Sequence, residues 1–360
     1  MSLFDINPDI RKAETLASEF YTNPAFFEAS KERIFARTWQ IVGESEDVRL
    51  PGQMKPHTIL EGFLDEPVLL TRDATDVVHC LSNVCTHRGN ILIEGACVET
   101  GIRCRYHGKK FKLNGEFVSM PEFEEAENFP TAADNLPLVP FDIWGKFLFA
   151  SVNPVAPLKE FLAAVEKRLF WLEWNNFKFA PVRSRDYLVK AHWALYCENY
   201  LEGLHIPFIH NSLNNAVDYG SYTTELFPLS NLQLGLSRGG ENTFDLPESA
   251  PDFGKQVSAY YFWVFPNLML NFYPWGLSVN IVKPLTPSLT KVSFLTFVAD
   301  ESKLEQGAGA NLDRVEREDE AVVENVQRGI RSRFYDKGRY SPSRETGTHH
   351  FHRLIAEFMV

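Results

Sequence analysis

The sequence predicts an α+β protein, in which an all-β region precedes a region where an antiparallel sheet grips a long helix. Between Trp39 and about Val152, short segments of alternating polarity are separated by turn residues, which is typical of an all-β domain. Four strand-like runs joined by Pro-containing turns follow later, at residues 259–265, 268–273, 277–283 and 291–298. A helical pattern covers residues 310–331. We expect the sheet to curve around this helix and to leave a pocket between them.

The order of the elements divides the chain into three parts. Residues 13–37 are predicted to be helical with a break at Asn23-Pro24, and another helix is predicted over residues 158–171. A stretch with two prolines at 153–157 marks a domain boundary. The 360 residues suffice for two domains. We therefore predict an N-terminal helical segment that packs on the C-terminal domain, an all-β domain and the C-terminal domain itself, at residues 1–38, 39–155 and 156–360.

Charge and cysteine content restrict the compartment and the partners. A formal net charge of −11 argues against binding to nucleic acid or to an anionic membrane surface. No apolar run is long enough to span a membrane, and the N-terminus lacks the pattern of a signal peptide. Cys80, Cys97 and Cys197 do not suggest a disulfide framework. We therefore expect a cytoplasmic protein.

Two short segments each supply one cysteine and one histidine. They contain Cys85 with His87 and Cys104 with His107, and a glycine follows each histidine within two residues. Two thiolates on one iron and two imidazoles on the other are the ligands of a Rieske [2Fe–2S] cluster, which transfers single electrons. The glycines allow the backbone to approach the cluster. A structural zinc site is the alternative, because two Cys and two His also bind zinc, but the mixed and closely spaced pairs favour iron.

A second set of polar side chains lies around Pro207. Glu198, Glu202 and His205 are spaced i, i+4 and i+7, so a helix would place all three on one face. Pro207 is expected to end that helix, which leaves His210 in the following turn, where it can approach His205. Two imidazoles and one carboxylate form the facial triad that binds non-haem Fe(II) and leaves positions open for oxygen.

The third ligand is predicted to come from the helix over residues 310–331. The apolar stripe of this helix consists of Leu312, Val315, Val322, Val326 and Ile330. Asp319 falls on the stripe, and a lone carboxylate on an inward face is costly unless it is paired or bound to a metal. Most of the other acids are expected beside the stripe or on the opposite face: Asp313, Glu316, Glu318, Glu320 and Glu324. We therefore predict Asp319 as the third ligand.

With these motifs the chain resembles the catalytic α subunits of Rieske non-haem iron oxygenases, the aromatic-ring-hydroxylating oxygenase family. The resemblance begins at Thr38-Trp39 and ends with residues 326–329, so it covers nearly the whole chain. It implies two thiolate and two imidazole ligands for the cluster irons, namely Cys85 and Cys104 on one and His87 and His107 on the other. It implies three ligands for a mononuclear Fe(II), namely His205, His210 and Asp319.

The resemblance also implies roles for Asn199 and Glu202. Asn199 corresponds to an asparagine close to the mononuclear iron. Glu202 corresponds to a carboxylate that bridges a cluster histidine of the neighbouring subunit and an iron-ligand histidine of its own subunit. The family usually has Asp at this position, and Glu occurs in the branch that acts on choline, carnitine and betaines. Residues 265–276 also resemble that branch.

Aromatic residues are expected in the region of the iron, most of them as core residues and only some in contact with substrate: Tyr196, Phe262, Trp263, Phe265, Phe272, Tyr273 and Trp275. Such rings can bind a trimethylammonium group by cation–π attraction or a flat aromatic molecule by apolar burial. From the branch resemblance we expect O2-dependent hydroxylation next to a quaternary nitrogen, giving oxidation or N-demethylation. The alternatives are an aromatic-ring-hydroxylating or O-demethylating oxygenase and, in a different class, a Rieske electron carrier without catalysis.

The expected partners follow from what the chain lacks and from the bridging role. It contains no Gly-rich dinucleotide motif and little spare length for a flavin domain. A separate NAD(P)H-dependent reductase or ferredoxin is therefore expected to supply the electrons. If Glu202 bridges subunits, the oligomer is a closed ring, and the family resemblance implies a homotrimer.

Overall fold

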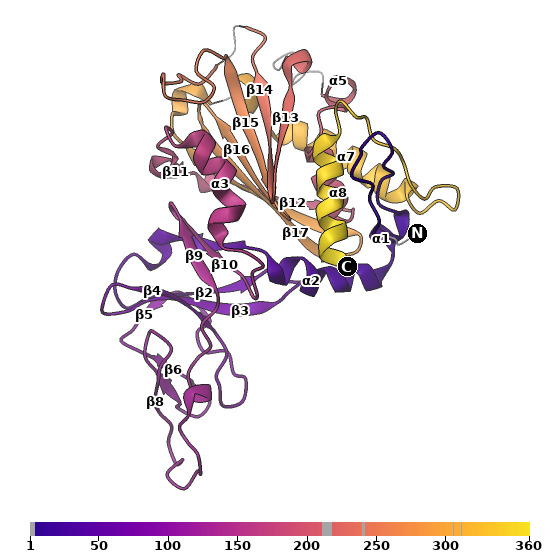
Figure 1. Cartoon of the computed structure of the whole chain (residues 1–360). Coiled ribbons are helices and arrows are strands. Elements are labelled where there is room, and N and C mark those ends of the chain that lie inside the picture. The colour runs from indigo at the N-terminus through magenta and orange to yellow at the C-terminus, as the bar shows by residue number, and fades with distance from the viewer. Residues whose placement is uncertain (1–3, 211–217, 240–241, 305, 311) are drawn as a thin grey trace. The chain divides into compact units, whose positions relative to one another are not determined.

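The computed structural model describes residues 4–210, 218–239, 242–304, 306–310 and 312–360, with only the backbone described at Ala308. The chain forms two compact units (Figure 1). One unit is continuous and spans Phe35–Leu158. The other is discontinuous and combines Met1–Ile34 with Lys159–Val360.

The unit Phe35–Leu158 consists of short antiparallel strands, which confirms the predicted all-β domain. A four-stranded sheet has the order β4-β3-β2-β5, with bounds Val78–Ser82, Glu66–Arg72, Gln53–Ile59 and Cys97–Val98. A second sheet has the order β1-β10-β9, with bounds Gln40–Glu44, Phe147–Ala150 and Phe141–Trp144. A third has the order β6-β7-β8, with bounds Ile102–Arg103, Lys110–Phe111 and Phe117–Ser119. Short 3-10 helices cover Phe35–Arg37, Ser45–Val48 and Ala132–Asp134.

The other unit is built on one large antiparallel sheet. Its strand order is β11-β18-β17-β16-β15-β14-β13, and β12 also pairs with β18. The bounds from β11 to β18 are Lys178–Phe179, Arg185–Val189, Thr223–Phe227, Ser230–Leu236, Val257–Val264, Leu268–Tyr273, Gly276–Thr286 and Leu289–Val298. The four predicted strands correspond to β15–β18 and are confirmed. The other four strands were not predicted.

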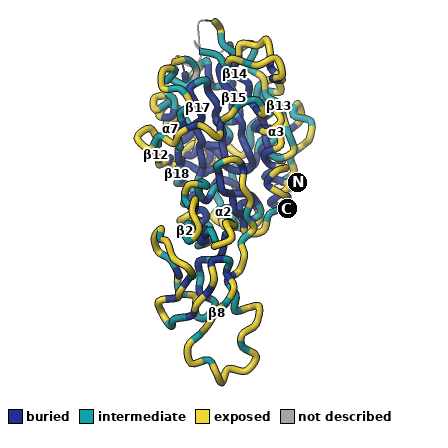
Figure 2. The backbone as a smooth tube through the Cα atoms, turned by 90° about the vertical axis from the view of Figure 1, so that its left-hand side faces the viewer, coloured by how far each residue is buried: buried dark blue, intermediate teal, exposed yellow. Residues whose placement is uncertain are grey.

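The register of the central strands sets one wall of the site. Gln233 on β14 pairs with Tyr261 on β15, which in turn pairs with Asn271 on β16. Residues directly opposite each other across neighbouring strands project to the same face of a sheet. These three side chains therefore form one row. The strands around this row are mostly buried on both faces (Figure 2).

Helices complete this unit: α1 Ser18–Thr22, α2 Pro24–Arg33, α3 Leu158–Leu169, α4 Trp193–Tyr200, α5 Ile206–Ile209, α7 Leu312–Gly329 and α8 Thr346–Met359. Short 3-10 helices cover Trp174–Asn176, Pro181–Arg183, Tyr219–Ser221, Glu301–Lys303 and Gly307–Gly309. Asn23 accepts a hydrogen bond from the N–H of Ala25, and Pro24 lies in the first turn of α2, so the predicted break between the first two helices is confirmed.

Two helices bring the site together. α4 packs against both α7 and β17, so side chains of α4 and α7 can meet beside the sheet. α8 has no counterpart among the predicted elements, although its residues are largely buried. Within the described residues, none of the helices has the length and apolar character needed to cross a bilayer.

Candidate active site

The segment between α4 and α5 shapes one side of the site, and here the predicted helix is wrong. α4 ends at Tyr200 instead of continuing toward Pro207. Gly203 lies so close to Tyr222 that a Cβ atom on it would come within 3.0 Å of the ring. Pro207 lies in the first turn of α5, where a missing N–H is tolerated. The proline therefore begins a second helix instead of ending the first.

Because the helix is interrupted, Glu198 does not share a face with Glu202 and His205. The carboxylate of Glu198 accepts a hydrogen bond of 2.7 Å from the hydroxyl of Tyr21 and lies 3.1 Å from Nε2 of His352. Glu198 thus belongs to a buried polar network of its own. The predicted common face of the three side chains is wrong for this one residue.

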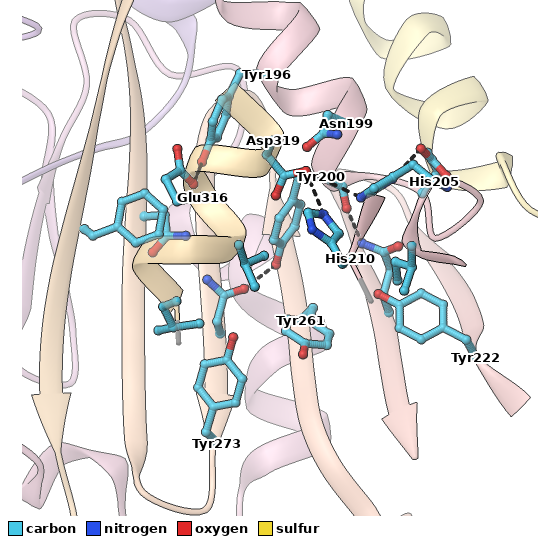
Figure 3. A pocket seen from close by; sticks show the side chains of 18 residues that line it. Tyr196, Asn199, Tyr200, His205, His210, Tyr222, Tyr261, Tyr273, Glu316 and Asp319 are labelled. Atoms are coloured by element: carbon cyan, nitrogen blue, oxygen red, sulfur yellow. Dashed lines mark hydrogen bonds and ion pairs between the residues drawn. The ribbon is translucent and has the colours of Figure 1, made fainter. Parts of the chain in front are cut away.

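His205, His210 and Asp319 bring one ligand atom each to within 4.8 Å of one another. Nε2 of His210 lies 2.9 Å from Oδ1 of Asp319, and Nε2 of His205 lies 3.6 Å from the same oxygen (Figure 3). The imidazole rings stand edge to face, with 5.1 Å between their centroids. Two imidazole nitrogens that converge with one carboxylate oxygen are the donor set of a 2-His-1-carboxylate site for Fe(II).

Two further carboxylates orient the imidazole rings. Nδ1 of His205 lies 2.6 Å from Glu202, and Nδ1 of His210 lies 2.8 Å from Glu318. Each ring is therefore held at Nδ1 while Nε2 is turned toward Asp319, which fixes both tautomer and orientation. Sequence reasoning missed Glu318, because its contact with His210 arises only when α7 packs beside α5.

The charges around His210 favour a cation at the centre of the site. Burial lowers the pKa of His210, but hydrogen bonds and attraction from Asp319 and Glu318 outweigh it, so that this pKa is raised above its ordinary value. The same carboxylates would stabilise a metal ion in place of the proton. The electrostatics and the donor set therefore agree.

Glu202 is held in place by the backbone as well as by His205. One of its oxygens accepts hydrogen bonds from the N–H groups of Leu204 and His205, and the other is the partner of the His205 ring. Asn199, near the end of α4, lines the same pocket as Glu202 and the three converging side chains. Both residues thus lie beside the three converging side chains.

The buried face of α7 differs from the predicted stripe. Glu316, Val323 and Gln327 are buried, whereas Val326 is 42% exposed. Glu316 was not singled out among the flanking acids of this helix, yet it is only 4% exposed. The sequence does carry a signal for it, because Glu316 precedes Asp319 by three residues and both must lie on one side of a helix.

The surroundings of Glu316 perturb its acidity. The hydroxyl of Tyr196 donates a hydrogen bond of 2.6 Å to Oε2 of Glu316. Burial raises the pKa of Glu316 to about 8, against the lowering effect of this hydrogen bond. A buried carboxylate with a strongly shifted pKa beside a metal-type donor set is a marker of a functional pocket.

A pocket beside the three converging side chains is walled largely by aromatic rings (Figure 3). Its rings are Tyr196, Tyr200, Tyr222, Tyr261, Tyr273 and Phe294. Its neutral polar side chains are Asn199, Gln233, Asn271 and Asn280. The hydroxyl of Tyr200 donates to Asn271 over 2.6 Å, which fixes one ring against the sheet. The arrangement suits a small, apolar and positively charged group.

The seven aromatic residues named from the sequence divide as expected between pocket and core. Tyr196 and Tyr273 line the pocket, whereas five others are buried core residues that do not line it: Phe262, Trp263, Phe265, Phe272 and Trp275. Strand alternation explains part of this division, because Tyr261 faces the pocket and its neighbour Phe262 must point to the other face. Periodicity defines the two faces of a strand but not which one carries the pocket.

In the unit Phe35–Leu158, the two Cys–His segments adopt the same backbone pattern. The N–H of Cys85 donates to the carbonyl of residue 90, and the N–H of Gly89 donates back to the carbonyl of Cys85. Cys104 and Gly108 repeat both bonds at the same spacing, with residue 109 as the acceptor. Both glycines have φ near +75°, at +73° and +79°, a region that favours glycine.

The donors of these two loops face one another. Cys85 and Cys104 are buried, and the rings of His87 and His107 are 4.8 Å apart between centroids. The Nδ1 atoms of both histidines are buried without a hydrogen-bond partner among the described residues. Buried polar atoms that lack a hydrogen-bond partner are costly unless a bound group satisfies them. Two thiols and two such imidazole nitrogens fit a [2Fe–2S] cluster of the Rieske type.

Comparison with known proteins agrees with both sites. The family described as "Ring hydroxylating alpha subunit (catalytic domain)" matches residues 178–360, and the family described as "Rieske [2Fe-2S] domain" matches residues 38–130. The chain is 31% identical to choline monooxygenase, chloroplastic, of Arabidopsis thaliana, over 98% of this chain and 84% of that protein. It is 27% identical to the carnitine monooxygenase oxygenase subunit of Escherichia coli K12, over 98% of this chain and 96% of that subunit.

A solved structure shares the fold. The crystal structure of the quaternary ammonium Rieske monooxygenase CntA in complex with the inhibitor MMV12 matches with a TM-score of 0.79 at 24% identity, over 98% of this chain and 97% of that one. The two matched domains exclude the zinc site and the catalytically inactive electron carrier that the sequence left open. The chain belongs to the Rieske non-haem iron oxygenases, as a catalytic α subunit.

Proposed function

We propose that this chain uses O2 to hydroxylate a small quaternary ammonium compound, with oxidation or N-demethylation as the outcome. The observation that carries the proposal is the pocket beside His205, His210 and Asp319, which combines aromatic rings with carboxylates. Aromatic faces attract a trimethylammonium group by roughly 1–2 kcal/mol each when the contact is desolvated. The similar choline and carnitine monooxygenases are named for substrates of this class.

The residues around the pocket would have different roles in this reaction. His205, His210 and Asp319 would hold Fe(II), which supplies O2 activation when bound. Glu202 and Glu318 keep the two imidazole rings turned toward that position. The aromatic wall excludes water from the substrate, which strengthens electrostatic contacts inside the pocket.

We propose that Asn199 acts beside these ligands. It lies near the end of α4, on the wall of the same pocket. Its amide can both donate and accept hydrogen bonds. It is therefore suited to hold a polar group of the substrate, or a water molecule, close to the iron position.

Electrons would enter through the second site. Cys85 and Cys104 would bind one iron of the cluster, and His87 and His107 the other. We propose Glu202 as the link between a cluster histidine of a neighbouring subunit and His205. Each carboxylate oxygen can accept more than one hydrogen bond, so Glu202 retains acceptor capacity beyond its present contacts.

This link requires a closed ring of subunits, for which we propose a homotrimer. A separate reductase or ferredoxin would reduce the cluster. A cytoplasmic location is part of the same proposal, because none of the five cysteines forms a disulfide, as suits a reducing compartment.

A single-turnover experiment tests the proposed reaction. The holoenzyme, with the cluster reduced chemically and the mononuclear site loaded with Fe(II), is mixed with O2 and one candidate substrate at a time. Choline, carnitine and glycine betaine form one arm, and benzoate and toluene the other. We expect product and cluster reoxidation in the first arm. Product from the aromatic compounds alone would overturn the proposal.

The same pocket favours one alternative. Its rings would also bury a flat aromatic molecule, as expected for an aromatic-ring-hydroxylating oxygenase. The carboxylates beside the rings would not attract an aromatic substrate that is neutral or negatively charged. The second arm of the single-turnover experiment decides between these two substrate classes.

A further inference from the structure

The charged side chains that line the pocket are all acidic, apart from the two histidines of the iron site. Three carboxylates line it, those of Glu202, Glu316 and Asp319, and no Lys or Arg lines it among the described residues. The residues outside the described ranges include no Lys or Arg either: 1–3, 211–217, 240–241, 305 and 311. A negatively charged group of a substrate would therefore meet no cationic side chain of this chain in the pocket.

Bound iron does not remove this imbalance. Fe(II) held by two neutral imidazoles and Asp319 offsets two of the three negative charges. Glu202 is also satisfied locally, since its oxygens accept from His205 and from backbone N–H groups. Glu316 is left as the carboxylate without a counter-charge, and burial keeps it largely protonated near pH 7 while the pocket is empty. An uncompensated buried charge is costly, so Glu316 would ionise when a substrate supplies a single positive charge beside it.

Two polar atoms of the pocket wall that lack hydrogen-bond partners also favour a cationic substrate. Oε1 of Glu316 is buried and has no hydrogen-bond partner among the described residues. The same is true of Oε1 of Gln233, whose amide nitrogen donates to the carbonyl of Tyr200. Both atoms are acceptors. A cation or a hydroxyl donor would satisfy them, whereas a substrate carboxylate is itself only an acceptor.

We propose that this pocket selects a monocationic quaternary ammonium substrate that carries a hydroxyl group and no carboxylate, with Glu316 as the counter-charge of the ammonium group. The inference rests on the proposed function and narrows it, because betaines and carnitine are zwitterions. The amides of Asn199 and Asn271 can donate to a carboxylate, but they are neutral and cannot offset its charge.

Choline and glycine betaine form a matched pair for the test. They share the trimethylammonium group and differ in one carbon, which is an alcohol in choline and a carboxylate in glycine betaine. Binding to the holoenzyme is measured by calorimetry without O2, so the readout does not depend on turnover. We expect choline to bind at least about tenfold more tightly than glycine betaine, which corresponds to one charge-compensating contact.

Glu316→Gln tests the counter-charge directly. We expect this variant to lose at least about tenfold in choline affinity while its affinity for glycine betaine is unchanged or higher. Glu320→Gln is the matched control, because it removes the same charge from the same helix at a position that does not line the pocket. It should bind both ligands like the parent chain. The neutral isostere 3,3-dimethylbutan-1-ol should bind Glu316→Gln and the parent chain equally.

The outcomes separate this inference from the proposed function. Equal affinity of the parent chain for choline and glycine betaine would overturn the inference and leave the proposed function standing. Parent-like choline binding by Glu316→Gln would overturn the role of this residue. Absence of binding by every ammonium compound would overturn the proposed function as well. If Glu316→Gln does not fold, the choline and glycine betaine comparison on the parent chain decides the inference alone.

Discussion

The ammonium group of Lys109 lies 2.9 Å from the carboxylate of Asp134, in a buried site next to the cluster loops. Lys109 is only 2% exposed, and its ammonium group is 5.3–5.7 Å from the centroids of three rings, those of Phe111, Phe117 and Phe129. The backbone carbonyl of Lys109 accepts from the N–H of Cys104, and that of Asp134 accepts from the hydroxyl of Thr86. One ion pair therefore connects both ligand-bearing loops.

Lys109→Met should destabilise the cluster-bearing unit. The change keeps an unbranched side chain among the rings but leaves Asp134 without its cation, and breaking a buried ion pair costs roughly 3–5 kcal/mol. Loss of the cluster absorbance on heating the holoprotein measures the effect. Lys112→Met is the control, because the pair of Lys112 with Glu116 is exposed and contributes little. Equal melting of the two variants would contradict the expectation.

The ion pair between Lys109 and Asp134 should also affect the reduction potential of the cluster. A buried positive charge stabilises the reduced, more negative cluster, and little water is present to screen it. Lys109→Met should therefore lower the midpoint potential, and Asp134→Asn should raise it. Redox titration followed by the optical spectrum of the cluster measures both. Shifts of the same sign in the two variants would indicate a structural effect instead of an electrostatic one.

Asp319→Ala should lose the mononuclear iron while the cluster spectrum survives. The variant removes the one carboxylate oxygen toward which both Nε2 atoms converge. Iron analysis should fall from about three to about two irons per chain, by the number of sites. Glu318→Gln, which alters only the support of His210, should weaken iron binding about 10- to 100-fold. The reverse ranking would show that Glu318 is the ligand.

Glu202→Gln should leave both metals bound and slow electron transfer between them. The amide oxygen can still accept from the backbone N–H groups that Glu202 now holds, so the local fold is expected to persist. Single-turnover reoxidation of the reduced cluster by O2 with substrate present measures the step. A rate equal to that of the parent chain would refute the bridging role.

His192 should make the protein sensitive to acid. Burial lowers the pKa of His192 from 6.5 to about 3, so below pH 6.5 the unfolded chain binds a proton that the folded chain does not. Stability from this residue is complete above pH 6.5 and falls by up to about 1.4 kcal/mol per pH unit as the pH decreases toward 3.

His192→Asn isolates this contribution. The Asn side chain can replace Nδ1 of His192 as the acceptor for the N–H of Ala194 at the start of α4. Denaturant unfolding at pH 7 and at pH 5 should show a smaller pH difference in this variant than in the parent chain. An identical difference would mean that other groups control the acid sensitivity.

The parts of the sites that could be predicted are those determined by local sequence. Cys85 with His87, and Cys104 with His107, lie within short loops that end at a glycine with positive φ, so their spacing alone indicates their chemistry. The central strands of the large sheet could be predicted for the same reason. Each is a continuous run bounded by turn residues.

The errors occur where distant residues decide the local structure. α4 ends at Tyr200, and Gly203 just beyond it lies against Tyr222, a contact between distant residues that a helical pattern does not contain. Glu318 acquires its contact with His210 only through tertiary packing. Val326 and Glu316 were misjudged because the buried face of α7 is set by α4 and the sheet, not by apolar residues alone.

The discontinuous unit has a consequence for how the protein is made. The N-terminal part of this unit forms hydrogen bonds with residues that are synthesised much later. The hydroxyl of Tyr21 donates to Glu198, and the N–H of Leu16 donates to His352 on α8. The continuous unit Phe35–Leu158 leaves the ribosome complete long before α8 is translated. Iron–sulfur assembly can therefore start on a nascent chain, whereas the ferrous site needs residues up to Asp319 on α7, which are translated later.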